Sequence, residues 1–123
     1  MQKTQYEHEA VTLLRSHNVA ILSTISKRYE DFPFGSLITY VTDQNRSIYI
    51  YASDIAEHTK NILNNSKSCL TIFNITKEDD KQNSSRLSIM GNFNKVEKGA
   101  SLASCKDRFF KFLPKSEGLA III

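Results

Sequence analysis

Hydrophobic and polar positions alternate along the first half of the chain with two different periods. Between residues 3 and 16 apolar residues, beginning with Tyr6, recur every three or four positions, which predicts an amphipathic helix. Residues 17–27, 34–42 and 47–53 are instead dense in β-branched and aromatic side chains, which predicts three strands. Short polar turns separate these strands, so we expect each to pair antiparallel with the next.

The second half of the chain continues with helices and strands in alternation. Helices are expected at residues 54–65 and 99–114, and strands at 67–76, 86–97 and 117–123. The all-polar segment between the fourth and fifth strands predicts a solvated loop, because its adjacent Asp79 and Asp80 alone are weak support for a metal site. Gly91 predicts a bulge or a close backbone approach within the fifth strand. We therefore expect no metal.

Together these elements predict a mainly β (α+β) fold with a single domain over residues 1–123. Six strands joined mostly by short turns indicate an antiparallel meander, with the helices covering its open parts. Strands two to five carry apolar residues on both faces. A closed or half-closed barrel whose outside is also buried would explain this pattern.

Composition and charge narrow the class of protein only slightly. The net charge of +3 is spread thinly, with no block of Lys and Arg, so a nucleic-acid partner is not expected. The polar N-terminus lacks a signal-peptide core, and no stretch reaches the ~20 apolar residues that span a bilayer. We therefore expect a cytoplasmic protein without a membrane partner. Cys69 and Cys105 sit among apolar residues, which is typical of buried thiols.

The stretch SDIAEHTKN, residues 53–61, carries the strongest chemical signal. Asp54 followed by Glu57 fits a capping box, so the helix is expected to begin at Asp54 with Ser53 just outside it. A helix start offers free N–H groups that attract a phosphate, and Ser53, His58 and Lys60 add further donors. The alternative is an ordinary capped surface helix, since the carboxylates of Asp54 and Glu57 would repel a phosphate unless they face away.

Helical spacing also predicts which side of this helix faces the core. The predicted inward stripe consists of Ile55, Thr59, Ile62 and Leu63. Two strand ends could add to an anion site. Gly35 permits close backbone approach and Ser36 supplies a hydroxyl, while the planar fork of Arg86 suits a phosphate.

The order of these segments resembles a known family. FPFGSLITYVTDQNRSIYIYASDIAEHTKNILNNSKSCLTIF, followed after a polar loop by RLSIMGNF, is similar to the pyridoxamine 5′-phosphate oxidase-like family of FMN-binding split barrels. It most resembles the haem-utilisation branch, in which a Gly-Ser strand, a Ser…His-Thr-Lys-Asn helix start and an Arg-Leu-x-x-x-Gly strand recur in this order. The resemblance covers roughly residues 10–113.

The resemblance implies a six-stranded antiparallel split β-barrel with flanking helices that forms a homodimer with FMN at the interface. The residues it places at the cofactor are Phe34, Gly35 and Ser36 at the isoalloxazine ring, Tyr51, Ala52 and Ser53 beside the ribityl chain, and His58, Thr59, Lys60 and Arg86 at the phosphate. The oxidase proper of this family has basic residues at the positions of Glu57 and His58, and Glu57 departs from that pattern.

The C-terminal part of the chain departs further from the family. The substrate-binding Arg and His of the vitamin B6 oxidase are missing, so pyridoxamine phosphate oxidation is not expected. Haem-degrading members continue past the position of Ile123 with a region that contacts haem. Either the chain is truncated, or its apolar last strand is buried in the barrel or the dimer.

The residues and the family resemblance together suggest three alternative functions. The first is an FMN-dependent oxidoreductase that binds a small molecule, for which no catalytic residue can be named. The second is a haem-binding or haem-degrading protein, which needs an axial ligand from His8, His17 or His58, the histidines of the chain. The third is a dimeric barrel that has lost its cofactor, or a regulator.

Overall fold

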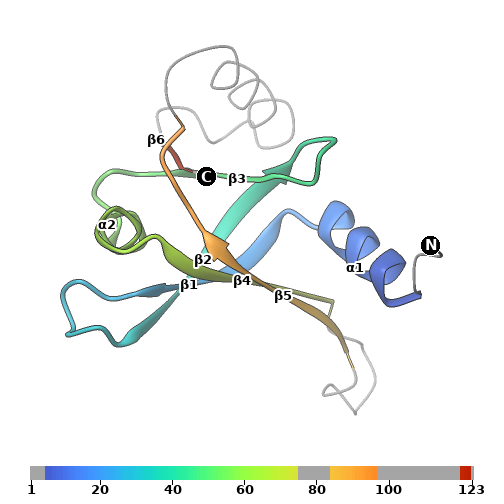
Figure 1. Ribbon diagram of the computed structural model, residues 1–123, viewed down its shortest axis with the longest axis horizontal. Helices are drawn as coiled ribbons and strands as arrows, with labels where there is room; N and C mark the ends of the chain where they lie inside the picture. The colour runs from blue at the N-terminus through green and yellow to red at the C-terminus, as the bar shows by residue number, and fades with distance from the viewer. Residues whose placement is uncertain (1–4, 75–83, 97–119, 123) are drawn as a thin grey trace.

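The computed structural model describes residues 5–74, 84–96 and 120–122 (Figure 1). The elements in chain order are α1 (Gln5–Ser16), β1 (Val19–Ile25), β2 (Pro33–Thr42), β3 (Ile48–Ala52), α2 (Glu57–Asn64), β4 (Lys67–Asn74), β5 (Ser85–Asn92) and β6 (Ala120–Ile122). These bounds agree with the expected helix and strands up to β5 to within a few residues. The expected helix at residues 99–114 and the loop that contains Asp79 and Asp80 lie outside the described residues.

The strands form one antiparallel sheet in the order β5-β4-β1-β2-β3-β6. The sheet curls into half a barrel, with β3 and β6 facing back over the other strands (Figure 1). The expectation of a mainly β, antiparallel and half-closed barrel is therefore confirmed. The expected sixth strand is represented by only three residues, which pair with β3.

The prediction of a simple meander is wrong at two connections, since β6 pairs with β3 and not with β5, and β4 also changes its partner. β1, β2 and β3 are sequential neighbours, but β4 pairs with β1 instead of β3. The physical reason is α2, which carries the chain from the end of β3 across the barrel to the free edge of β1. A strand keeps the same two-residue period whichever strand it pairs with. The sequence pattern therefore could not reveal that β4 pairs with β1.

The concave face of the sheet holds the core. Its buried members are Leu13, Leu14, Ala20, Leu22, Ile38, Tyr40, Ile50, Ala52, Ile62, Leu70 and Ile72. On β1 the buried residues are every second one, Ala20, Leu22 and Thr24, as the two-residue period of a strand requires. The intervening positions form the outer face of the sheet.

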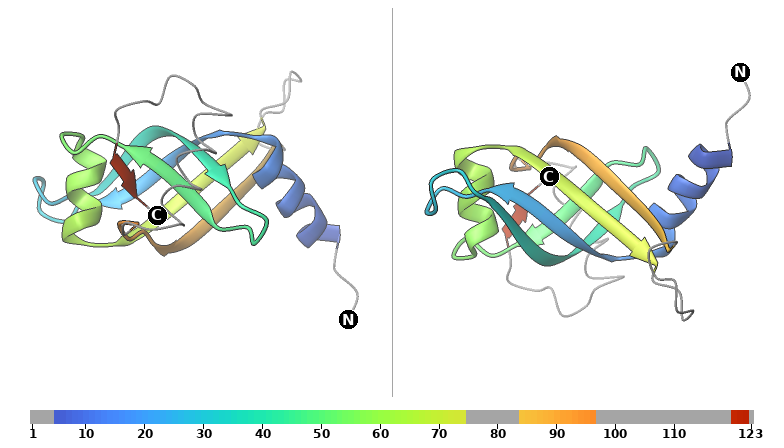
Figure 2. Two further views of the ribbon diagram at one scale, coloured as in Figure 1. Left: turned by 90° about the horizontal axis from the view of Figure 1, so that it is seen from above. Right: turned by 90° about the horizontal axis from the view of Figure 1, so that it is seen from below.

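The two helices lie at opposite ends of the half-barrel (Figures 1 and 2). α1 packs its C-terminal turn against β4 and β5 through Leu13 and Leu14. The Tyr40 hydroxyl donates a 2.7 Å hydrogen bond to the Leu14 carbonyl oxygen and so joins α1 to β2. Tyr6, expected on the inward stripe, is 82% exposed because the first turns of α1 extend past the sheet (Figure 2).

α2 begins later than predicted. Its N-cap is Ala56, which makes no side-chain cap hydrogen bond, and residues 54–56 form a turn. The predicted capping box of Asp54 and Glu57 is therefore wrong. Its place is taken by Ser53, whose hydroxyl oxygen accepts a 3.3 Å hydrogen bond from the Ile55 backbone N–H and closes the turn before the helix.

The inward face of α2 is shifted from the predicted stripe. Thr59 and Ile62 are buried as expected, but Ile55 and Leu63 are exposed. Asn61 is fully buried in their place. The later helix start explains Ile55, which lies in the preceding turn and outside the helical period.

Two smaller expectations also change. Gly91 pairs with Ser68 in an unbroken β4–β5 register, so the predicted bulge is absent. Cys69 is half-buried on the outer face of the sheet, beside Met90 of β5 and Ser23 of β1, and is not a core thiol. Cys105 lies outside the described residues. None of the helices in the described ranges is long and apolar enough to cross a membrane.

Candidate functional site

The start of α2 presents uncapped backbone donors. The first intrahelical bond runs from the Lys60 N–H to the Ala56 carbonyl at 3.2 Å, so the N–H groups of the first turn have no helical acceptor. No side chain of Ala56 can cap them. A helix end of this kind favours an anion, since the helix dipole adds its positive end to the free N–H groups.

The acidic side chain of this first turn faces the β1–β2 turn. A Glu57 carboxylate oxygen lies 3.8 Å from a guanidinium nitrogen of Arg28, which also stacks on the Tyr29 ring at 5.3 Å. The ion pair is partly exposed and contributes little stability. Its structural effect is to hold the Glu57 charge toward the β1–β2 turn, which weakens the objection that Glu57 repels a phosphate.

Thr59 and His58 supply two polar groups with unusual surroundings. The Thr59 hydroxyl is completely buried and has no hydrogen-bond partner among the described residues. A buried hydroxyl without a partner costs free energy and calls for an explanation, such as a bound ligand or water. Burial lowers the pKa of His58 below its usual 6.5, so the ring is neutral at pH 7 and can only hydrogen-bond an anion.

Asn61 fastens α2 to the start of the barrel. Its Nδ2 donates to the Thr24 hydroxyl at 3.0 Å, and its Oδ1 accepts a 3.0 Å hydrogen bond from the Lys27 backbone N–H. Thr24 pairs with Phe34 across β1 and β2. Through this network the predicted site residues of α2 and the first residues of β2 lie at the same end of the barrel.

The strand residues of the predicted site divide between the two faces of the sheet. Phe34 and Ser36 are half-buried and pair with the core positions Thr24 and Leu22. Gly35 is exposed on the outer face, where an added Cβ would lie 3.8 Å from the nearest side-chain atom, that of Ile21. Packing within the chain therefore does not require a glycine at this position.

The β3 residues of the predicted site lead directly into α2. Ala52 is buried and, like Tyr51, pairs with β6. Ser53 is half-buried and makes the turn described above. Lys60 is exposed on α2. The structure thus brings Ser53, His58, Thr59 and Lys60 together around one helix start.

Arg86 is separated from this group. It pairs with Phe73 at the end of β4 opposite to Lys67, where the chain enters from α2. Six residues of strand correspond to about 20 Å. Arg86 also points to the outer face, so one chain does not bring its guanidinium to the α2 start.

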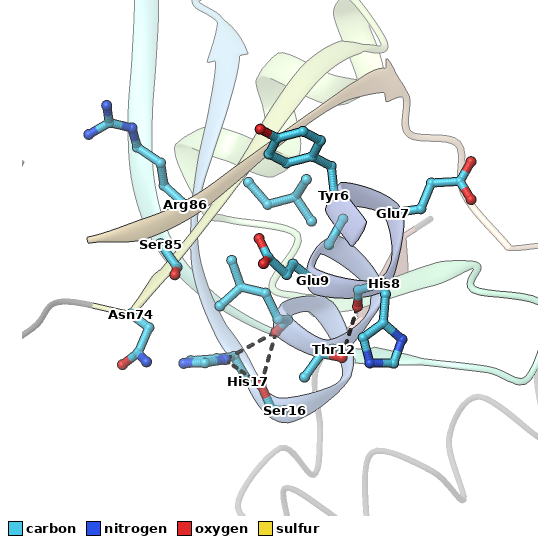
Figure 3. A pocket seen from close by; sticks show the side chains of 13 residues that line it. Tyr6, Glu7, His8, Glu9, Thr12, Ser16, His17, Asn74, Ser85 and Arg86 are labelled. Atoms are coloured by element: carbon cyan, nitrogen blue, oxygen red, sulfur yellow. Dashed lines mark hydrogen bonds between the residues drawn. The ribbon is translucent and has the colours of Figure 1, made fainter. Parts of the chain in front are cut away.

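A second hollow lies beside α1 (Figure 3). This α1 groove has a volume of about 760 Å³ and runs between α1 and the neighbouring ends of β4 and β5. Its walls join the apolar side chains of Leu13 and Leu87 to polar and charged ones: Glu7, Glu9 and His17 on the side of α1, and Asn74, Ser85 and Arg86 at the strand end. Its volume lies within the range of small-molecule sites.

Sequence reasoning missed two features of these regions. Asn61 adjoins the His-Thr-Lys motif, but no periodic signal marks it as buried, because an asparagine on a helix is most often exposed. The α1 groove joins the N-terminal helix to a hairpin about 70 residues later in the chain. Only the crossover of β4 to β1 creates that neighbourhood, and this crossover was not predicted.

Comparison with known proteins gives matches at the level of sequence and of fold. The family model described as the CREG β-barrel matches residues 2–118. The chloroplastic haem oxygenase HOZ of Arabidopsis thaliana is 38% identical over 64 residues, which are 52% of this chain and 20% of that protein. The chain therefore spans about a fifth of the length of this relative.

Two solved structures illustrate the fold similarity. A haem-binding protein from Mycobacterium smegmatis superposes with a TM-score of 0.79 at 23% identity, covering 99% of this chain and 51% of that one. The haem storage protein HutZ from Vibrio cholerae gives a TM-score of 0.74 at 18% identity, covering 97% and 88%. At these identities the likeness shows a shared barrel fold. The haem-utilisation branch named from the sequence fits these matches.

Proposed function

The chain belongs to the CREG β-barrel family, and from this premise and its sequence match to a haem oxygenase we propose that it binds haem. The carrying observation is the 38% identity over 64 residues, because the solved neighbours share only the fold. FMN, the cofactor that the sequence favoured over haem, is the second candidate.

The described residues meet only part of what a haem site needs. A flat apolar macrocycle requires a hollow with apolar walls, but the α1 groove of about 760 Å³ is lined by Glu7, Glu9 and Arg86 as well as by Leu13 and Leu87. The iron requires a donor atom, and His8 and His17 are the histidines in the lining of this groove. Bound haem would supply iron chemistry with oxygen, while the protein would bind and orient the macrocycle.

Haem binding predicts a change in both absorbance and stability. Titration of the purified chain with haemin is expected to give a saturable, sharpened Soret band. At haemin held about 100-fold above the dissociation constant, the free energy of unfolding should rise by about 2.7 kcal/mol. A Soret band that never saturates, together with an unchanged melting temperature, would contradict the proposal.

FMN is the second candidate, supported by the uncapped start of α2. Free N–H groups, the Ser53 hydroxyl and the exposed Lys60 form a donor set suited to a phosphate. With FMN bound, the flavin would supply the redox chemistry of an oxidoreductase, and these residues would hold its phosphate.

This candidate predicts that the phosphate carries the affinity. FMN is expected to raise the melting temperature of the chain, whereas riboflavin, which lacks the phosphate, should raise it much less. The Lys60→Ala variant should weaken FMN binding, and Lys67→Ala, which removes an exposed lysine from β4, should not. Equal shifts with FMN and riboflavin would count against the α2 site. No shift with FMN or haemin would favour a barrel without a cofactor.

We also propose that the chain forms a homodimer through the outer face of the sheet. Val19, Leu37, Phe73 and Met90 project from β1, β2, β4 and β5 on this face, and Leu37 and Met90 are 70% and 82% exposed. Exposed apolar patches of this kind mark interaction surfaces. In such a dimer Arg86, which shares this face, is the residue that a partner could contribute to a cofactor site at the interface.

A charge on this face is expected to separate the dimer. Leu37→Asp should convert a dimer into a monomer in sedimentation-velocity experiments, because a buried carboxylate without a partner is strongly unfavourable. Leu63→Asp places the same charge on an exposed leucine of α2 and should leave the dimer intact. A wild-type chain that sediments as a monomer at all concentrations would refute the proposed dimer.

A further inference from the structure

We propose that the two copies of the proposed homodimer interlock through one reciprocal contact, in which Leu37 of each copy enters a hollow on the outer sheet face of the other. This inference rests on the proposed homodimer and names the side chains that make its central contact. It depends on three features of the outer face: the hollow itself, the projection of Leu37, and the position of β1 between them.

The outer face of the sheet is hollowed where β1, β4 and β5 lie side by side. This outer-face hollow has a volume of about 450 Å³ and a mostly apolar lining. Ser23, Cys69 and Met90 line it and lie level with one another across the three strands. The short side chains of Ser23 and Cys69 are half-buried, whereas Met90 is 82% exposed. The hollow therefore has a low floor and one flexible wall, because a methionine side chain adapts its shape to its neighbours.

Leu37 projects from the same face of the sheet. It lies on β2, level with Ile21 of β1, and is 70% exposed. Side chains stand roughly perpendicular to a sheet, so Leu37 cannot bend down into the hollow of its own chain, which lies beyond β1. The face thus combines an exposed apolar side chain with an apolar hollow that this side chain cannot fill within one copy.

A second copy of the chain matches both features at once. In a two-fold interface the same patch lies on both sides, so the contact of Leu37 with the partner's hollow is made twice. A different protein would need a separate match for the leucine and for the hollow. The reciprocal contact removes both exposed leucines from water, and this burial of apolar surface is the main favourable term in association.

The same symmetry places β1 at the centre of the interface. Cys69 of β4 is level with Ser23, and Leu37 of β2 is level with Ile21. β1 therefore lies midway between the hollow and the projecting leucine. A two-fold axis that exchanges the two must pass over this midpoint. We therefore expect Ser23 and Ile21 to lie against the same strand of the partner.

The test is sedimentation equilibrium of the full chain and its variants. Leu37→Ala removes the projecting side chain and Cys69→Leu fills the hollow, so each should raise the dimer dissociation constant more than about tenfold. In the double variant the larger side chain at position 69 occupies the space that Leu37 vacates, so the two effects should be clearly less than additive in free energy. Leu63→Ala truncates an exposed leucine of α2 and should dimerise like the wild type.

The Cys69 thiol gives a second readout that leaves the hollow unchanged and does not depend on the folding of Cys69→Leu. A maleimide should label Cys69 several times more slowly in the wild-type dimer than in Leu37→Asp, as measured by mass spectrometry of the labelled peptide. A dimer that Leu37→Asp separates, but with equal labelling rates and additive effects, would overturn the reciprocal contact and leave the proposed homodimer standing. A wild type that is monomeric at all concentrations would overturn both proposals.

Discussion

Replacing Asn61 with alanine is expected to lower the free energy of unfolding by about 2–4 kcal/mol. The substitution removes two buried hydrogen bonds, one to the Thr24 hydroxyl and one from the Lys27 N–H. Each buried group that loses its partner costs about 1–3 kcal/mol. The loss should be visible as a lower midpoint in urea denaturation with an unchanged slope.

Two variants separate this effect from a general weakness of the helix. Asn64→Ala changes an exposed asparagine of the same helix and should alter stability by less than about 0.5 kcal/mol. Thr24→Val removes the acceptor of one bond, so its effect and that of Asn61→Ala should be less than additive in a double-mutant cycle. An Asn61→Ala variant as stable as the Asn64→Ala variant would show that the network does not hold α2.

Asn61 also shows where sequence reasoning succeeds and where it fails. The strands up to β5 could be predicted because their two-residue period and β-branched residues act locally. The start of α2 could not, because Asp54 and Glu57 satisfy the capping pattern while tertiary contacts set the helix start at Glu57. Asn61 is buried for the same reason, since its partners come from β1 and the turn after it.

The candidate site was predictable only in part. Ser53, His58, Thr59 and Lys60 are close in the sequence, so a local motif could group them. Their relation to Arg86 depends on strand order, and the crossover to the free edge of β1 places that residue at the far end of β5. The α1 groove depends on the same crossover. Long-range strand pairing therefore limited the prediction of function more than secondary structure did.

Tyr40 is expected to make the fold sensitive to alkali. Burial raises the pKa of Tyr40 from its ordinary 10.0 to about 12. Between pH 10 and pH 12 the unfolded chain loses this proton while the folded chain retains it, so rising pH favours unfolding. The contribution to stability is fully present below pH 10 and is lost as the pH rises to about 12, by roughly 1–3 kcal/mol.

Tyr40→Phe tests both the hydrogen bond and its titration. At pH 7 the variant should be less stable by about 1–2 kcal/mol, because the Leu14 carbonyl loses its 2.7 Å partner. Its loss of stability above pH 10 should be smaller than that of the wild type, since phenylalanine does not ionise. Tyr29→Phe, at an exposed position, should keep the wild-type decline. Equal declines in Tyr40→Phe and the wild type, measured by urea denaturation at pH 9 to pH 11.5, would show that another group controls the alkaline transition.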